Sequence, residues 1–214
     1  MSAEPLTPES SRGDAKRRAI LDVAHDVFLA QGYAATSMSE IAAKVGGSKG
    51  TLYNYFRSKE ELFSAFMNDI CVSQAAIYFD PLRPIGDGGS VRASLIDLGV
   101  SLLDFLQQPD IMAVHRLVIA EVGRFPELGE LFYQNGPKRG EIRFTEIFRE
   151  AMAKGLLPPA DPRMVGQRLK DLVMSDIYMQ LMWGVQDGLG AARTRAHVAE
   201  SVDIFLKAFG PAAR

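Results

Sequence analysis

Apolar residues recur along most of this chain at intervals of three and four, which is the period of a helix with one buried face. The first such segment runs from about 20 to 28, and Gly32 follows where a helix commonly ends. No run alternates between apolar and polar residues over a useful length. Later segments with the helical period lie at about 91–107, 110–124, 126–134, 138–154, 162–183 and 191–209. We therefore predict an all-α protein of about nine or ten helices.

The pattern between residues 15 and 60 predicts a small domain of three helices. Ser37 and Glu40 have the spacing of a capping box, so a second helix begins there and ends at the glycine pair 46–47. Ser48 can cap a third helix that runs to about residue 56. Two short helices joined by a glycine-containing turn are typical of a helix-turn-helix motif that reads DNA.

The stretch GGSKGT in this turn also has the composition of a phosphate-binding loop. Such a loop requires Gly-Lys followed by Ser or Thr, between a strand and a helix. Here the order is Lys49-Gly50-Thr51, and the preceding element is a predicted helix. Catalytic signatures such as G-x-S-x-G and H-E-x-x-H are absent, and the three histidines lie on different predicted helices. We expect no catalytic residues, no metal site and no cofactor.

The third helix is the candidate recognition helix. At about 1.5 Å per residue it is roughly 13 Å long, which fits a major groove about 12 Å wide. Leu52 and Phe56 are spaced to face the core. Gly50 costs roughly 1 kcal/mol of helix stability relative to Ala, which a close approach to DNA would offset. The opposite side carries Lys49, Gly50, Thr51, Tyr53, Asn54 and Tyr55, unless it is simply a solvent-exposed helix.

Composition narrows the class of protein. The chain has 214 residues, 47% of them hydrophobic, and a net charge of -2, so it is not a polycation. Residues 1–59 carry 8 Lys/Arg against 6 Asp/Glu, and the remainder carries 16 against 20, which suggests one nucleic-acid-binding end. The one cysteine, Cys71, cannot form an internal disulfide. With no signal peptide and no run of 18 apolar residues, we expect a cytoplasmic protein without a membrane segment.

Residues 17–67 resemble the DNA-binding domain of the TetR/AcrR family of transcriptional regulators. Gly47 departs from the pattern, because the family usually has an apolar residue there. The matching positions are Phe28, Gly32, Tyr33, Thr36, Ile41, Ala42, Val45, Gly46, Ser48, Lys49, Gly50, Thr51, Leu52, Tyr53, Tyr55, Phe56, Ser58, Lys59, Glu60, Glu61 and Leu62. The resemblance implies that base edges or phosphates are approached by Lys49, Gly50, Thr51, Tyr53 and Asn54. It implies phosphate contacts from Thr36 or Ser37, from Tyr55 and from Lys59. Ser48, at the start of the third helix, is also among the implied DNA-binding residues.

The same resemblance implies the organisation of the rest of the chain. We expect a flexible tail over 1–14, the helix-turn-helix domain over 15–60, and an effector-binding and dimerisation domain over 61–214. In the family the last two long helices form the homodimer interface. The resemblance therefore places this interface on residues 162–183 and 191–209. The apolar faces of these helices could instead close the chain's own core. A dimer with two-fold symmetry suits a palindromic DNA site.

A small, hydrophobic effector is expected among the helices of the second domain. Residues 120–132 resemble the AefR-like subgroup of the family, which does not identify the effector. The candidate effector-binding residues are Phe105, Met112, His115, Arg116, Phe148, Tyr178 and Trp183. Taken one at a time, such residues are more often core residues than ligand contacts, and Arg116 could equally pair with Glu121 or Glu127 on the surface.

The predicted function is a DNA-binding transcriptional regulator, in particular a ligand-responsive repressor that binds a palindromic operator in double-stranded DNA as a homodimer. The alternative is a helical protein-interaction module without DNA affinity, which would use the tyrosine-rich face of the third helix. An enzyme is the weakest of the three hypotheses.

Overall fold

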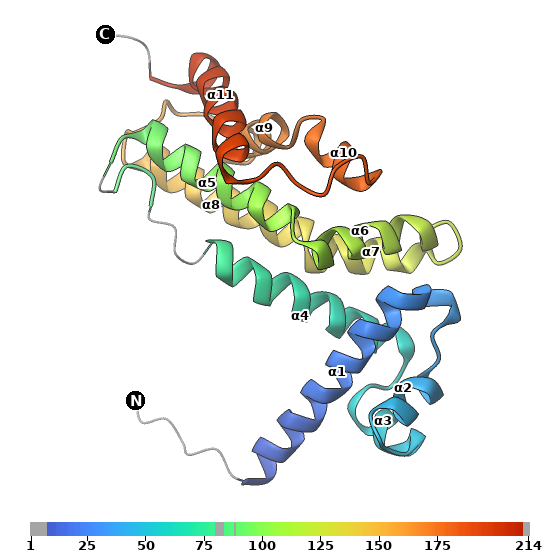
Figure 1. Ribbon diagram of the computed structural model, residues 1–214. Coiled ribbons are helices and arrows are strands. Elements are labelled where there is room, and N and C mark those ends of the chain that lie inside the picture. Colours follow the sequence, from blue (N-terminus) through green and yellow to red (C-terminus); the bar gives the residue numbers. More distant parts are fainter. Residues whose placement is uncertain (1–7, 80–83, 88, 212–214) are drawn as a thin grey trace. The chain divides into compact units, whose positions relative to one another are not determined.

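The computed structural model of the protein describes residues 8–79, 84–87 and 89–211. The described residues form eleven helices and no strand, which confirms the predicted all-α class (Figure 1). The segment 80–90 is rich in Pro and Gly, which predicts a loop, and residues 80–83 and 88 of that segment lie outside the described residues. The helices are α1 (Pro8–Ala35), α2 (Met38–Lys44), α3 (Lys49–Tyr55), α4 (Lys59–Phe79), α5 (Val91–Leu106), α6 (Pro109–Glu121), α7 (Pro126–Asn135), α8 (Pro137–Ala153), α9 (Pro162–Met174), α10 (Ile177–Met182) and α11 (Ala191–Phe209).

The helices form two compact units, whose boundary differs from the expected division at residue 60. The first unit comprises the residues up to 69 together with 117–132, and the second comprises 70–116 and 133–214. The first half of α4 belongs to the first unit because its apolar side chains pack there. The expected tail over 1–14 also differs, because α1 already begins at Pro8, while residues 1–7 lie outside the described part.

Aromatic side chains form the core of the first unit. Phe28 of α1 lies 5.0 Å from Phe63 and 5.5 Å from Phe66 of α4, measured between ring centroids. Tyr33 lies 5.1 Å from Phe63 and 5.1 Å from Phe125. Edge-to-face aromatic pairs contribute beyond the area they bury. The segment 117–132 is therefore attached to this unit through Phe125, although it is remote in sequence.

Gly32 produces a kink near the end of α1. Its φ of 84° lies in the left-handed region that favours glycine. A Cβ atom at this position would lie 2.9 Å from a carboxylate oxygen of Glu121, so space also requires glycine. The same oxygen accepts a 2.9 Å hydrogen bond from the backbone N–H of Ala34. The backbone N–H of Ala34, next to the kink, thus finds its acceptor in Glu121 of the segment 117–132.

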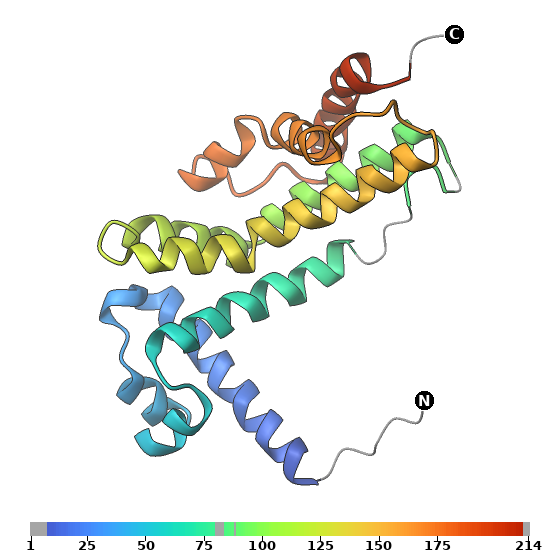
Figure 2. The ribbon, with the colours of Figure 1, turned by 180° about the vertical axis from the view of Figure 1, so that it is seen from behind.

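In the second unit, α9 packs against α8, α11 and α5, which lie side by side in both views (Figures 1 and 2). A Cβ atom at Gly99 of α5 would approach Val198 of α11 to 2.6 Å and Val173 of α9 to 3.2 Å. The absent side chain therefore allows the three helices to meet closely. Val165 and Leu169 of α9 are buried in the same core.

The single helix expected over 162–183 is divided into α9 and α10. Ser175 ends α9 with a φ of 42°, and Ser and Asp side chains commonly compete with helical backbone hydrogen bonds. The last carbonyls of α9 are satisfied by α11: Ser201 donates to the oxygen of Leu172 at 3.2 Å, and His197 Nε2 donates to that of Val173 at 2.9 Å. Tertiary contacts thus stabilise a helix end that the apolar periodicity does not predict.

Helix α4 is long and apolar enough to cross a membrane by length and composition alone, a test that core helices also pass. Its residues Leu62, Phe63 and Phe66 are buried against α1 aromatic residues or within the same core, which accounts for its apolar composition. Cys71 on this helix is buried, and burial raises the pKa of its thiol to about 11.

Candidate nucleic-acid interface

The turn between α2 and α3 has the geometry that the glycine pair predicts. Gly46 has a φ of 70°, and its N–H donates to the carbonyl of Ala43 at 3.1 Å. The N–H of Gly47 donates to the carbonyl of Ala42 at 3.0 Å. These two bonds are the Schellman pattern, which ends a helix and satisfies its last carbonyls. At its other end α2 is capped by Ser37, whose hydroxyl accepts from the N–H of Glu40 at 3.2 Å.

Helix α3 is held by one cap and two buried side chains. The Ser48 hydroxyl accepts a 3.1 Å hydrogen bond from the Thr51 N–H and lies 2.9 Å from the Thr51 hydroxyl. Leu52 and the C-cap residue Phe56 are each 2% exposed, as their spacing predicts. A seven-residue helix has little stability of its own. These anchors therefore determine how its remaining side chains are presented.

The outer face of α3 presents a compact group of polar and aromatic side chains. Ser48, Lys49, Gly50 and Asn54 are exposed, and Tyr53 is 40% exposed. The Lys49 ammonium lies 5.8 Å from the centroid of the Tyr53 ring. Amide, hydroxyl and ammonium groups on one short helix match the donors and acceptors of base edges and phosphates. Thr51 and Tyr55, at the border of this face, are half-buried.

Among the residues that the structure describes, none requires glycine at position 50. A Cβ atom there would make only ordinary contact, at 3.7 Å from the Ser48 hydroxyl oxygen. Glycine in a helix costs about 1 kcal/mol relative to Ala. An external contact, in which another backbone approaches this helix closely, would account for a residue that the fold itself does not need.

Two of the predicted phosphate-binding side chains are engaged within the protein instead. Thr36 is 3% exposed, and its hydroxyl donates to the carbonyl of Gly32 at 2.7 Å. The Lys59 ammonium donates to the carbonyls of Tyr33 at 2.9 Å and Thr36 at 3.0 Å. It also lies 4.2 Å from the centroid of the Tyr33 ring. Both donors hold the corner between α1 and α2, which short-range sequence patterns do not reveal.

The environment of Lys59 fits this internal role. Burial lowers the pKa of Lys59, with opposing contributions from the nearby carboxylates of Glu60 and Glu121. Tyr33, whose backbone carbonyl accepts from Lys59, donates its own hydroxyl to Glu60 at 3.1 Å. Burial, followed by this hydrogen bond, raises the pKa of Tyr33 above its ordinary value. Lys59 and Tyr33 are therefore part of one polar network at the corner, in which Tyr33 is buried and Lys59 is half-buried.

The sequence-based candidates also missed Lys16 and Arg17 of α1, which contact residues at the two ends of α3. The Lys16 ammonium donates to the carbonyl of Val45 at 3.2 Å. The Arg17 guanidinium lies 5.3 Å from the centroid of the Phe56 ring. The run of basic residues at 16–18 is visible in the sequence, but these partners of Lys16 and Arg17 lie 29 and 39 residues away and only the fold identifies them.

The predicted effector residues are only partly brought together. His115 Nδ1 lies 2.8 Å from the Tyr178 hydroxyl. The Arg116 guanidinium donates to the carbonyls of Leu181 and Met182 at the end of α10. Trp183 is 71% exposed.

The other predicted effector residues are core residues or lie against neighbouring aromatic rings. Phe148 is fully buried against Phe205, with ring centroids 5.8 Å apart, and Met112 is also buried. Phe105 packs near Phe79, at 5.9 Å between ring centroids. Burial lowers the pKa of His115 to about 4, so its ring is neutral at pH 7. The His115–Tyr178 pair is therefore a neutral, half-buried polar contact.

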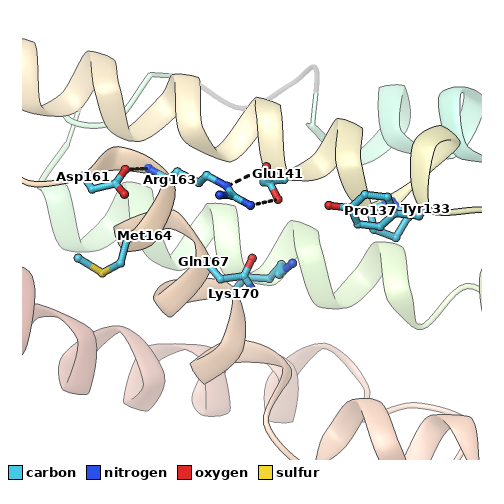
Figure 3. Close-up of a pocket in the computed structure, with 8 residues that line it drawn as sticks. All are labelled: Tyr133, Pro137, Glu141, Asp161, Arg163, Met164, Gln167 and Lys170. Carbon is cyan, nitrogen blue, oxygen red and sulfur yellow. Dashed lines mark hydrogen bonds and ion pairs between the residues drawn. The ribbon is translucent and has the colours of Figure 1, made fainter. Parts of the chain in front are cut away.

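A separate surface pocket of about 470 Å³ lies in the second unit and contains none of the predicted effector residues (Figure 3). The close-up shows Arg163 directed at Glu141, with two hydrogen bonds of 3.0 and 3.1 Å. The bond from Arg163, followed by that from Lys138, lowers the pKa of Glu141 to about 2. The main charged pair of this pocket is thus satisfied internally. Its lining is Tyr133, Pro137, Glu141, Asp161, Arg163, Met164, Gln167 and Lys170.

Two sequence models of known families match the chain. One, described as bacterial regulatory proteins of the tetR family, matches residues 20–66. The other, described as the C-terminal domain of AefR-like transcriptional repressors, matches residues 93–211 and so covers more than half of the chain. Together they include α2, α3 and the second unit from residue 93 to residue 211.

Solved structures and a curated relative agree with these matches. The flavonoid-responsive regulator FrrA is 31% identical, with a TM-score of 0.82 and coverage of 94% of this chain and 100% of FrrA. A TetR-family transcriptional regulator from Mesorhizobium loti MAFF303099 is 27% identical, with a TM-score of 0.82 and coverage of 94% and 99%. The HTH-type transcriptional regulator YhgD of Bacillus subtilis (strain 168) is 24% identical over 175 residues, which is 78% of this chain and 83% of YhgD.

The internal role of Lys59 can be separated from that of Lys49 by measuring stability. We expect Lys59→Ala to lower the free energy of unfolding by about 1–2 kcal/mol, because two charge-assisted hydrogen bonds to the corner carbonyls are lost. Lys49→Ala removes an exposed side chain and should change stability by less than about 0.5 kcal/mol. Urea unfolding of both variants measures this difference, and equal stability of the two would contradict the assignment.

The buried neutral state of His115 predicts a pH dependence of stability. In the unfolded chain the imidazole has its ordinary pKa of 6.5, whereas in the folded protein that pKa is about 4. The unfolded state therefore binds the extra proton between these values, so the free energy of unfolding should fall by about 3 kcal/mol from pH 6.5 to pH 4. The variant His115→Asn isolates this contribution, because its free energy of unfolding should not show this fall between pH 6.5 and pH 4. Parallel curves for the two proteins would refute the prediction.

Proposed function

The chain belongs to the TetR family of bacterial transcriptional regulators, and from that premise we propose that it is a ligand-responsive repressor that binds a palindromic operator as a homodimer. It would act in the cytoplasm, where operator DNA is located. The observation that carries the proposal is the outer face of α3, which is anchored by Leu52 and Phe56 and presents polar groups outward.

The exposed groups of α3 divide into two chemical roles. The Lys49 ammonium would contact a phosphate, which adds affinity for any DNA. The Asn54 amide has a donor and an acceptor that match adenine in the major groove, so it would contribute to sequence recognition. Gly50 would allow close approach of the backbone. The remaining contacts are proposed from Ser37, Ser48, Thr51, Tyr53 and Tyr55.

The dimer interface that we propose lies on the expected helices but uses their outward side chains, not their inward apolar faces. Val165, Leu169 and Val173 of α9 and the inward residues of α11 are buried in the chain's own core. The outward faces of these helices still carry the exposed apolar residues Met164 and Ile204. We place the contact between the two copies on these outward faces. A two-fold dimer would present two recognition helices to the two halves of a palindrome.

The effector proposal is a small, hydrophobic molecule bound in the second unit. FrrA, which has the same fold along its whole length, is flavonoid-responsive, so flavonoids are the first compounds to test. The His115–Tyr178 pair could orient such a ligand through hydrogen bonds, since an apolar site needs a few polar groups for orientation. The effector would regulate DNA binding only if it bound one conformation of the protein more tightly than the other.

Binding to DNA from the protein's own upstream region tests the function. We expect specific binding at moderate salt, and Asn54→Ala should reduce discrimination at one adenine position by about 1–3 kcal/mol. Lys49→Ala should weaken binding to all sequences and reduce the slope of log affinity against log salt by about 0.9. Fluorescence anisotropy with specific and scrambled duplexes measures both effects. Absence of sequence-specific binding by the unmodified protein would refute the repressor proposal.

The dimer surface is tested with two matched substitutions. Ile204 on α11 and Ile142 on α8 are 47% and 48% exposed, so a change to Glu has a similar intrinsic cost at both positions. Ile204→Glu should weaken the dimer at least tenfold, because a charge would be buried between the two copies. Ile142→Glu should leave it unchanged. Sedimentation equilibrium measures the dissociation constants, and an unchanged value for Ile204→Glu would exclude this surface.

A further inference from the structure

We infer that Lys16 of α1 is a positioning residue for the recognition helix, because it replaces the side chain that the turn before α3 lacks. The inference rests on the proposed function, since it assigns a residue that prepares α3 for operator binding. Lys16 lies outside the exposed face of α3 and is 33 positions before Lys49 in the sequence.

The turn lacks a contact that usually accompanies its hydrogen-bond pattern. In a Schellman motif the second residue after the C-cap commonly makes an apolar contact with the last turn of the helix. That residue is Gly47, which follows the C-cap Val45 and Gly46. Gly47 does not have a positive φ, so its backbone conformation does not require glycine. The turn therefore has the backbone bonds of the motif without its side-chain contact.

Lys16 lies where that side chain would be. A Cβ atom built on Gly47 would lie 3.9 Å from the Lys16 Nζ atom and 4.0 Å from its Cε atom. The ammonium donates to the carbonyl of Val45 at 3.2 Å. The end of the lysine side chain thus contacts the turn, while its charge satisfies a carbonyl at the C-terminus of α2, where a cation is favoured.

The contact is directly connected to α3. The same Cβ position on Gly47 would lie 3.9 Å from the Thr51 Cβ atom, in the first turn of the recognition helix. Thr51 is in turn bonded to the cap residue Ser48. Lys16 therefore supports the connection through which the direction of α3 is set. Loss of this support should populate orientations of α3 that cannot bind the operator. The apparent affinity for the operator then falls in proportion to the fraction of molecules that keep the binding-competent orientation.

A phosphate-binding role for Lys16 predicts different results. Phosphate contacts strengthen binding to all DNA and each increases the salt dependence of affinity. A positioning residue affects operator binding through the orientation of α3, so the salt slope should not change. A side chain added at position 47 could also replace a positioning residue, whereas it could not replace a cation on a phosphate.

Four variants distinguish these roles in the full-length protein. Lys16→Ala removes the stem and the charge, and Lys16→Met retains most of the stem without the hydrogen bond. Gly47→Val adds a side chain at the position that lacks one, and Lys16→Ala/Gly47→Val combines the two changes. Binding to the operator and to scrambled DNA is measured at several salt concentrations, and thermal unfolding verifies that each variant is folded.

We expect Lys16→Ala to weaken operator binding about tenfold, with a smaller loss on scrambled DNA and an unchanged salt slope. Lys16→Met should lose less than Lys16→Ala, and the double variant should recover most of the lost affinity. The inference is overturned if Lys16→Ala binds the operator as the unmodified protein does. It is also overturned if the salt slope falls by about 0.9 and Gly47→Val restores nothing, since Lys16 would then be a phosphate contact.

Amide hydrogen exchange separates failure of this inference from failure of the proposed function, because it requires no DNA. We expect faster exchange in the peptide covering residues 48–56 of Lys16→Ala, and restoration in the double variant. Unchanged exchange in that peptide would overturn the positioning role even if the protein binds its operator. Faster and restorable exchange in a protein that binds no DNA would support the positioning role and refute only the repressor proposal.

Discussion

The ammonium group of Lys59 holds the corner on which the first unit depends. It is shared between the carbonyls of Tyr33 and Thr36, at the kink where α1 ends and α2 begins, and it lies over the Tyr33 ring. The Tyr33 carbonyl also accepts the backbone N–H of Thr36 at 3.3 Å, so the corner combines a backbone turn with the lysine contacts. A charged donor at the start of α4 therefore connects three helices at one point. The buried aromatic residues Phe28 and Phe63 form the core of the same unit.

From this corner, the short helices α2 and α3 are positioned by local bonds and a few buried side chains. The Schellman turn and the Ser48 cap determine where α3 begins, and Leu52 and Phe56 attach it to the core. The side chains of α3 that could contact DNA are consequently the exposed ones, which do not anchor the helix to the core. This division explains why Lys49 and Asn54 remain candidates for DNA binding while Lys59 and Thr36 are assigned to the structure.

The second unit uses its apolar surface mainly on itself. Close approach at Gly99 brings α5, α9 and α11 together, and the inward faces of the last helices are consumed in that core. Only the outward residues remain for a partner copy. Three of the seven predicted effector residues, Phe105, Met112 and Phe148, are likewise committed to internal packing. The neutral His115–Tyr178 pair is a polar contact that a ligand could use.

The sequence alone determined the helical class, the helix-turn-helix and the inward and outward faces of α3. These features depend on apolar period, capping residues and turn glycines, which act over three or four residues. Only the tertiary structure decided the roles of Lys59, Lys16 and Glu121, because their partners lie between 23 and 87 residues away. It also decided the end of α9, where side chains of α11 satisfy the last carbonyls. Local patterns specify which groups need partners, whereas the fold decides which distant side chains supply them.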